Sequence, residues 1–158
     1  MNLKNPSLFK IFEILEKNLG SIRVSDNIQS QFSQIKSHFL ESAIEPEYFF
    51  SQIRINENYD GLATDSIFFD EKKVYDLVVG KHNLSLIETP WSDFTTVRIR
   101  AIPNITTKNE NNQTTKEVTG QRIRLELQGK NQLSLYYEDS DKEFENMFDL
   151  FKALKKYL

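Results

Sequence analysis

The spacing of apolar residues changes twice along this chain, and that change limits the folds open to it. Up to Pro46, apolar side chains recur every three or four positions, as on one face of a helix. From about Ser66 to Tyr137 they alternate with polar residues, as in half-buried strands. After Asp141 the helical spacing returns. The sequence therefore predicts an α+β protein in which two helices precede an antiparallel meander that is closed by a C-terminal helix.

Two amphipathic helices are predicted at the start of the chain. Asn5 is the candidate N-cap of the first, and Gly20 stands where it would stop. The second opens at Ser25 or Asp26 and ends at Glu45, because a residue before proline avoids the helical region. Each helix has one apolar face to bury, made by Leu8, Phe12, Leu15 and Leu19 in the first and by Ile28, Phe32, Ile35 and Phe39 in the second.

Two segments that follow the helices are harder to assign. Residues 47–56 fit both periods, and we predict a third short helix there, with a first strand as the alternative. Residues 56–67 partly match a calcium-binding loop, but Ile67 stands where the bidentate glutamate belongs. An Asx-rich turn leading into a strand is the better interpretation of this second segment.

Alternating apolar residues predict five strands. They are Leu77 with Val79, Leu84 with Leu86, Val97 with Ile99 and Ala101, Ile123 with Leu125 and Leu127, and Leu133 with Leu135 and Tyr137. Turn signals at 70–73, 80–83 and 129–131 separate several of them. The segment from Pro103 to Gly120 has few apolar residues and is predicted to be a long mobile loop.

The closing helix has the clearest signature in the sequence. Ser140 and Glu143 form a capping box, and Lys152, Lys155 and Lys156 lie at the negative end of the helix dipole. Its predicted apolar stripe consists of Phe144, Met147, Phe148, Phe151, Leu154 and Leu158.

The composition is typical of a soluble, folded protein. Its 158 residues suit a single domain, here with an N-terminal helical segment at 1–47 and a sheet with its helix at 66–158. No apolar run is long enough for a transmembrane helix and no signal peptide is recognisable, so with no cysteine we expect a cytoplasmic protein. A net charge of −3 argues against nucleic acid as the partner.

Catalytic and metal-binding motifs are missing. His38 and His82 lie on different predicted elements, and neither has partners at the spacing of a zinc site. The sequence has no Gly-rich phosphate loop, nucleophile elbow or paired-carboxylate motif. We therefore expect no metal and no cofactor, and the sequence favours a noncatalytic protein while leaving enzymatic activity open.

A meander of short strands closed by one amphipathic helix resembles the pleckstrin-homology-like fold, including the bacterial PH and GRAM-type families. The residues that carry the resemblance are "WSDFTTVRI", "RIRLEL", "NQLSLYY" and the helix after Asp141, within Ser66–Leu158. The resemblance implies a binding or scaffolding module. It implies no ligand site, because "FFDEKKVYDLVVG" lacks the Lys-x-Arg pattern of phosphoinositide binders. Secretion-chaperone-like and toxin-immunity-like proteins share the same order of elements.

Four arginines form the candidate site. If the strands flanking Pro103–Gly120 make one hairpin, a register that pairs Arg98 with Arg124 also pairs Arg100 with Arg122, and a slip of two residues keeps all four on one face. One interpretation is a solvated sheet face, partly neutralised by Glu126 and Glu138. The other is a site for an anion or an acidic partner, with Arg98, Arg100, Arg122 and Arg124 as donors and Tyr136 stacking beside them.

The leading functional hypothesis is a noncatalytic binding or adaptor module. We expect a protein partner, contacted through the N-terminal helices, a sheet edge or the long loop, and an anionic ligand or lipid headgroup is a second candidate. The alternative is a small enzyme or ligand carrier with an aromatic-lined pocket between helices and sheet. The sequence does not determine the oligomeric state.

Overall fold

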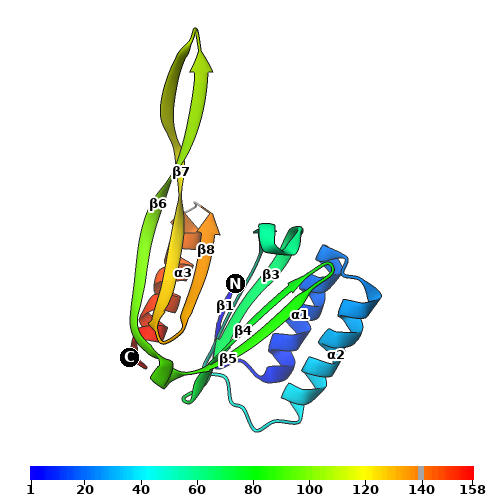
Figure 1. The fold of residues 1–158 in the computed structure, drawn as a ribbon. Coiled ribbons are helices and arrows are strands. Elements are labelled where there is room, and N and C mark those ends of the chain that lie inside the picture. The colour runs from blue at the N-terminus through cyan, green and yellow to red at the C-terminus, as the bar shows by residue number, and fades with distance from the viewer. Residues whose placement is uncertain (139–140) are drawn as a thin grey trace. The chain divides into compact units, whose positions relative to one another are not determined.

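A computed structural model describes the backbone of residues 1–138 and 141–158, and the side chains of residues 1–120, 122–135 and 145–158. The chain divides into two compact units, Met1–Trp91 and Ser92–Leu158. Each unit contains one antiparallel sheet and its own helices (Figure 1). This confirms the predicted α+β class, while the single domain expected from chain length stays a prediction.

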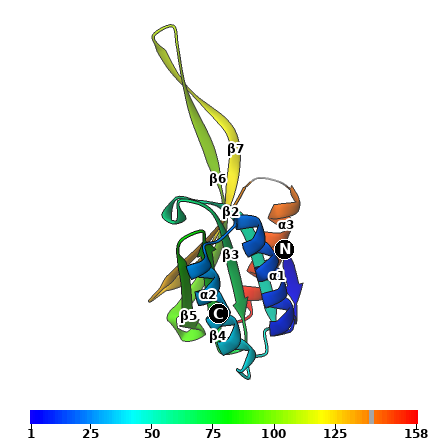
Figure 2. The ribbon, with the colours of Figure 1, turned by 90° about the vertical axis from the view of Figure 1, so that its right-hand side faces the viewer.

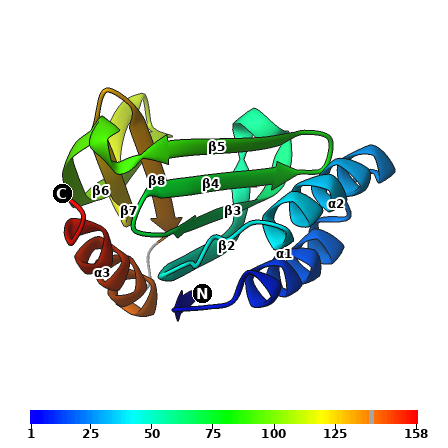
Figure 3. The ribbon, with the colours of Figure 1, turned by 90° about the horizontal axis from the view of Figure 1, so that it is seen from below.

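The first unit is a five-stranded sheet covered by two helices. Its strands follow one another in the order β1 (Asn2–Lys4), β2 (Tyr48–Asn56), β3 (Gly61–Phe69), β4 (Lys73–Gly80) and β5 (Leu84–Pro90). Seen from below, α1 (Leu8–Ile22) and α2 (Asp26–Leu40) lie next to each other along this sheet (Figure 3). They cover the face that carries Phe49, Phe68, Tyr75, Leu77 and Val79.

Both predicted helices exist, but three of their four predicted boundaries are wrong. Ser7, not Asn5, caps α1, because its Oγ accepts a hydrogen bond from the amide of Lys10. Gly20 lies within α1, which ends at Ile22 because Arg23 adopts a left-handed conformation there. Ser25 caps α2 as predicted, but α2 ends at Leu40, well before Glu45.

The predicted apolar faces of the two helices are the ones that pack. Phe12, Leu15 and Leu19 of α1 are buried, and so are Ile28, Phe32 and Phe39 of α2. Leu8 and Ile35 are partly buried against the same core. The two helices stand in front of the sheet when the molecule is turned by 90° (Figure 2).

The third helix predicted for residues 47–56 is wrong, since this segment is β2. It is hydrogen-bonded on both sides, to β1 and β3, and the run from Tyr48 to Ser51 is buried completely. Local spacing cannot separate a short buried strand from a helix, and the tertiary pairing decides. Strand structure therefore begins well before Ser66, with the short β1 at Asn2 and with β2 at Tyr48.

The turns between the strands of the first unit follow the sequence signals. Asn56 accepts a hydrogen bond from the amide of Asn58, and the short 3₁₀ helix Glu57–Tyr59 then leads through left-handed Asp60 into β3. This is the predicted Asx-rich turn. A second 3₁₀ helix, Trp91–Asp93, ends the unit, and the indole of Trp91 donates a 2.8 Å hydrogen bond to the carbonyl of Asp70.

The second unit is a three-stranded sheet with one helix. Strands β6 (Phe94–Glu110), β7 (Gln113–Gly129) and β8 (Gln132–Glu138) pair in sequence order, and α3 (Asp141–Lys155) packs on them. The buried apolar residues described in this unit are Phe94, Ile123, Leu125, Leu127, Leu133, Leu135, Met147, Leu150 and Leu154.

The predicted stripe of α3 is partly wrong. Met147 and Leu154 are buried, but Phe148 and Leu158 are each 41% exposed, and Leu150 takes a buried position instead. Positions 147, 150 and 154 follow the i, i+3, i+7 rule of one helical face. The capping box at Ser140 and Glu143, and the side chain of Phe144, lie outside the described residues.

The long loop predicted for residues 103–120 is wrong, since these residues are the outer half of the β6–β7 hairpin. We call this segment the arm. The register runs without interruption from Ile105–Val118 to Glu110–Gln113. Asn111 and Asn112 both have positive φ, which suits a two-residue hairpin turn. In Figure 1 the arm continues past the end of β8 within the second unit.

The arm needs no apolar core to form, because its backbone groups bond across the ribbon and its many threonines favour extended structure. A register shift between Asn104 and Ile105 separates it from the rest of the sheet. Gly120, at φ +147°, lies at that bulge, in a conformation that glycine adopts readily.

Candidate functional site

The four arginines lie on the face of the second sheet opposite its buried apolar residues. Arg98 pairs with Glu126, Arg100 with Arg124 and Ile102 with Arg122. The predicted pairing of Arg98 with Arg124 and of Arg100 with Arg122 is therefore wrong by two residues. A shift of two preserves the side of each strand, so the shared face predicted for the arginines is retained.

Glu126 lies at the centre of this face, with a side chain that is only 1% exposed. Its Oε2 accepts hydrogen bonds from Nε and Nη2 of Arg98, at 2.9 and 2.6 Å. Its Oε1 lies 2.6 Å from Nε of Arg124 and 3.4 Å from Nη2 of Arg100. One buried carboxylate thus holds three guanidinium groups.

The electrostatics of Glu126 follow from these contacts. Burial by itself raises the pKa of a carboxyl group, but the hydrogen bond from Arg98 and the charges of Arg124 and Arg100 outweigh it. The pKa of Glu126 therefore lies below its ordinary value, and the group is a carboxylate at neutral pH. We call Arg98, Arg100, Arg124 and Glu126 the arginine cluster.

The structure gives less detail on the other two predicted site residues, Arg122 and Tyr136. Arg122 lies opposite Ile102 on β6 and opposite Glu138 on β8. The backbone of Tyr136 pairs with Arg124, but its side chain lies outside the described residues, so its stacking stays a prediction. Sequence reasoning gave Glu126 the role of partial neutraliser, and its central, buried position is new information.

The face of the first sheet opposite its helices also carries a group of charged residues, next to buried apolar side chains such as Phe50 and Ile67. Asp65, 2% exposed, is ion-paired with Arg54, and Asp76 lies on the same face of the neighbouring strand. Burial raises the pKa of Asp65 despite its bond with Arg54. Burial, together with the charge of Asp65, raises the pKa of Asp76 to about 7. The sequence did not indicate this group, because the spacing of Arg54, Asp65 and Asp76 matches no known motif.

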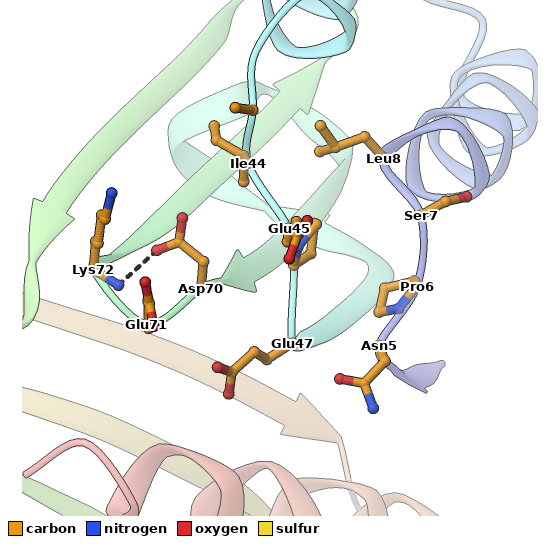
Figure 4. A pocket seen from close by; sticks show the side chains of 12 residues that line it. Asn5, Pro6, Ser7, Leu8, Ile44, Glu45, Glu47, Asp70, Glu71 and Lys72 are labelled. Atoms are coloured by element: carbon orange, nitrogen blue, oxygen red, sulfur yellow. Dashed lines mark hydrogen bonds between the residues drawn. The ribbon is translucent and has the colours of Figure 1, made fainter.

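A groove of about 640 Å³ opens between the start of α1, the segment before β2 and the β3–β4 turn (Figure 4). Leu8 and Ile44 lie at one end of it, and Asn5 and Glu47 at the other. The carboxylate of Asp70 accepts hydrogen bonds from the backbone amides of Lys72 and Lys73, within the β3–β4 turn. The groove is acidic and open, and its charges alone do not define a ligand.

Aromatic side chains fill the space between the helices and the first sheet. Phe12 packs against Phe32 and Phe39, and Phe39 makes edge contacts with Phe68 and Tyr75. All are at most 1% exposed. This is the arrangement of a packed core.

Metal binding and membrane insertion each need a particular arrangement of residues. No three His, Asp or Glu side chains among them come together to hold a metal ion. Within the same residues, no helix has the length and apolarity needed to span a bilayer.

No family model, curated protein or solved structure matches this chain. The resemblance to pleckstrin-homology-like domains therefore stays a prediction.

Proposed function

We propose that this chain is a noncatalytic binding module that contacts another protein through the arm. One observation carries the proposal: Ile105 and Val118 lie directly opposite each other on the arm, and they are 58% and 68% exposed. Directly opposite side chains on one face of a strand pair are close neighbours, so the two aliphatic side chains make one apolar spot. Here the pair is presented to solvent on an extended ribbon.

Apart from its backbone bonds, the arm is stabilised by exposed side-chain contacts only, such as the hydrogen bonds of Thr106 with Thr119 and of Thr114 with Asn109. Its Lys108–Glu117 ion pair is more than half exposed on both sides, and such pairs contribute at most about 1 kcal/mol. An isolated two-stranded hairpin is only marginally stable in water. A partner that buried Ile105 and Val118 would gain roughly 1.5–3 kcal/mol for each of them.

The two sides of the arm differ, which limits the chemistry of the partner. The side that carries Ile105 and Val118 also carries Thr107, Asn109, Thr114 and Lys116, by register. Lys108, Glu110 and Glu117 lie on the other side. The expected partner surface is therefore apolar, with a carboxylate placed to meet Lys116.

Two further points support a binding module. The order of elements, strands followed by one amphipathic helix, resembles pleckstrin-homology-like domains, which act by binding. The aromatic residues that would line a pocket contact one another instead, which favours this function over a ligand carrier. A cytoplasmic location, which suits a sequence without cysteine, belongs to the same proposal.

The test compares two double variants of the arm in a quantitative capture experiment. Ile105→Thr/Val118→Thr removes the aliphatic pair and keeps residues that favour strands. Lys108→Thr/Glu117→Thr changes the opposite side by the same number of positions and leaves the net charge unchanged. The wild type and Lys108→Thr/Glu117→Thr should capture the partner equally well. Ile105→Thr/Val118→Thr should bind it at least about tenfold more weakly, a loss of roughly 1.4 kcal/mol in binding free energy. Equal capture by both variants would contradict the proposal.

A further inference from the structure

Strand β5 forms one edge of the first sheet and is paired along one side only (Figure 3). Its register with β4 runs without interruption from Val79–Leu84 to Lys73–Pro90, and no strand of the described residues pairs with its outer side. At the other edge of this sheet, β1 has only three residues. A short edge strand is one of the ways in which natural sheets avoid pairing with other chains, and the seven-residue β5 lacks this protection.

The outward backbone groups of β5 follow from the hairpin turn that precedes it. The amide of Gly80 donates a 2.9 Å hydrogen bond to the carbonyl of Asn83, which makes these two residues a hydrogen-bonded pair. Hydrogen-bonded and non-hydrogen-bonded pairs alternate along an antiparallel ladder. The N–H and C=O groups of Leu84, Leu86 and Glu88 therefore point away from β4, in the direction of a further strand.

The side chains of β5 do little to block such pairing. The strand has no lysine, no arginine and no bulge, and Glu88 is its one charged residue. Ile87 lies opposite Asp76, on the face away from the helices, and is 53% exposed. Pro90 stands at the end of the strand, where it stops the ladder without interrupting its middle. The edge is therefore open and largely apolar.

We propose that the outer edge of β5 binds β5 of a second copy of this chain, antiparallel and with Leu86 at the twofold axis. In this register Leu84 of each copy faces Glu88 of the other, so the three outward residues of both strands are paired at once. Ile87 of each copy lies opposite Ser85 of the other. The two exposed isoleucines then become diagonal neighbours on one face of the shared sheet.

The charges of β5 favour a second copy in this direction. Antiparallel pairing places the two Glu88 carboxylates at opposite ends of the shared ladder, whereas in-register parallel pairing would place them side by side. It also brings the turn that contains Lys81, just before β5, towards the Glu88 end of the other copy. The edge is thus complementary to itself. The contact uses neither the arm nor the arginine cluster, so it stands or falls separately from the proposed protein contact.

Sedimentation equilibrium of the full chain tests the proposal. A contact between two edge strands buries little surface and belongs to the weak class of interfaces, so we expect a monomer–dimer equilibrium with a Kd between about 1 and 100 μM. A chain that remains monomeric up to about 500 μM, or that forms open-ended assemblies, would overturn the proposal.

Ile87→Lys places a charge at the contact. The two lysines would approach each other in the dimer, so the Kd should rise at least about tenfold. Ile55→Lys is the matched control, since Ile55 is a 71% exposed isoleucine on β2 of the same sheet, and this variant should change the Kd by less than about twofold. Equal weakening by both variants would show that association does not run through β5.

Glu88→Pro tests the backbone pairing itself. This variant removes the outward N–H of position 88 and leaves the bonds between β5 and β4 in place. Glu88→Ala removes the same carboxylate but keeps the N–H. Glu88→Pro should therefore dimerise at least about tenfold more weakly than Glu88→Ala. Equal Kd values would show that strand pairing is not the contact, and Ile87→Lys keeps the proposal testable if Glu88→Pro fails to fold.

Cysteine variants test the register, because the chain contains no cysteine of its own. Across the axis the two Cα atoms of position 86 should lie about 5.5 Å apart, within the reach of a disulfide. The two positions 88 are separated by roughly 13 Å along the strand direction, beyond that reach. Mild oxidation should therefore link two copies of Leu86→Cys and should not link Glu88→Cys. Any other pattern would overturn the antiparallel register centred on Leu86.

Discussion

Asp65 in the first sheet and Glu126 in the second are carboxylates with the same kind of partner, and both are almost inaccessible to solvent, 2% and 1% exposed, but Asp65 lies deeper in the protein. Their pKa values nevertheless move in opposite directions, upward for Asp65 and downward for Glu126. Burial opposes ionisation of both. Two differences explain this: Asp65 lies deeper in the protein, and it has one guanidinium group beside it, whereas Glu126 has three around it.

The comparison shows that burial alone does not set the state of a carboxyl group. Asp65 also has Asp76 on its own face of the sheet, so one arginine faces two acids. In the second sheet, one acid faces three arginines. The first face therefore tends to hold protons, whereas on the second the carboxylate stays ionised.

The largest expected effect is that of Glu126→Gln on stability. Removing the charge leaves three guanidinium groups around a buried, uncharged side chain, which should lower the free energy of unfolding by roughly 3 kcal/mol. Urea denaturation at neutral pH measures it, with Glu117→Gln, an exposed acid, as the control that should change by less than about 0.5 kcal/mol. Equal losses of stability in both variants would show that Glu126, with its three arginines, contributes no more than an exposed acid.

The pH dependence of the Glu126 contribution has a definite sign. Because the pKa of Glu126 is lower in the folded state, its contribution is complete above the ordinary pKa of 4.5 and is lost as the pH falls through the folded value. The stability difference between wild type and Glu126→Gln should therefore shrink below that pH. A difference that is constant down to acid denaturation would show that the charge is not responsible.

Asp76→Asn should have the next largest effect, with the opposite sign. The pKa of Asp76 is raised from 3.8 to about 7, so folding retains a proton and wild-type stability falls as the pH rises through that interval. At a pH above 7 the variant should be more stable than the wild type by roughly 1–2 kcal/mol, allowing for the partial exposure of Asp76. Below pH 3.8 the two should unfold at the same urea concentration, and a constant difference would contradict the shift.

A smaller loss is expected for Asp65→Asn. The variant leaves Arg54 without its carboxylate but also removes a charge that burial disfavours, so the two effects partly cancel. We expect a loss of about 1 kcal/mol at neutral pH, clearly below that of Glu126→Gln measured under the same conditions. A loss as large as that of Glu126→Gln would mean that one guanidinium group is as effective as three.

The smallest effect is expected at the exposed ion pair of the arm. Lys108→Thr/Glu117→Thr should change the free energy of unfolding by less than about 0.5 kcal/mol, because both side chains are more than half exposed. Raising the salt concentration should leave this small difference unchanged or reduce it. A loss above 1 kcal/mol in thermal or urea unfolding would indicate that the arm depends on this pair.

Several features follow from the sequence itself, because short-range chemistry produces them. Ser25 predicts the start of α2, since a serine hydroxyl before an amphipathic run caps the first turn. The apolar faces of α1 and α2, the Asx turn at Asn56 and the turns between later strands also follow from local patterns. The shared side of the arginines follows from alternation, because the apolar residues between them face the core and a slip of two residues preserves the side.

Other features were decided only by tertiary structure. Residues 48–56 became a strand because β1 and β3 pair with both of its edges, and the arm formed because two polar strands bond to each other without a core. The two-residue slip in register brought Glu126, rather than Arg124, opposite Arg98. Cross-strand neighbours depend on pairing over long separations, which local spacing does not encode, so the buried carboxylate at the centre of the arginine cluster appears only in the folded chain.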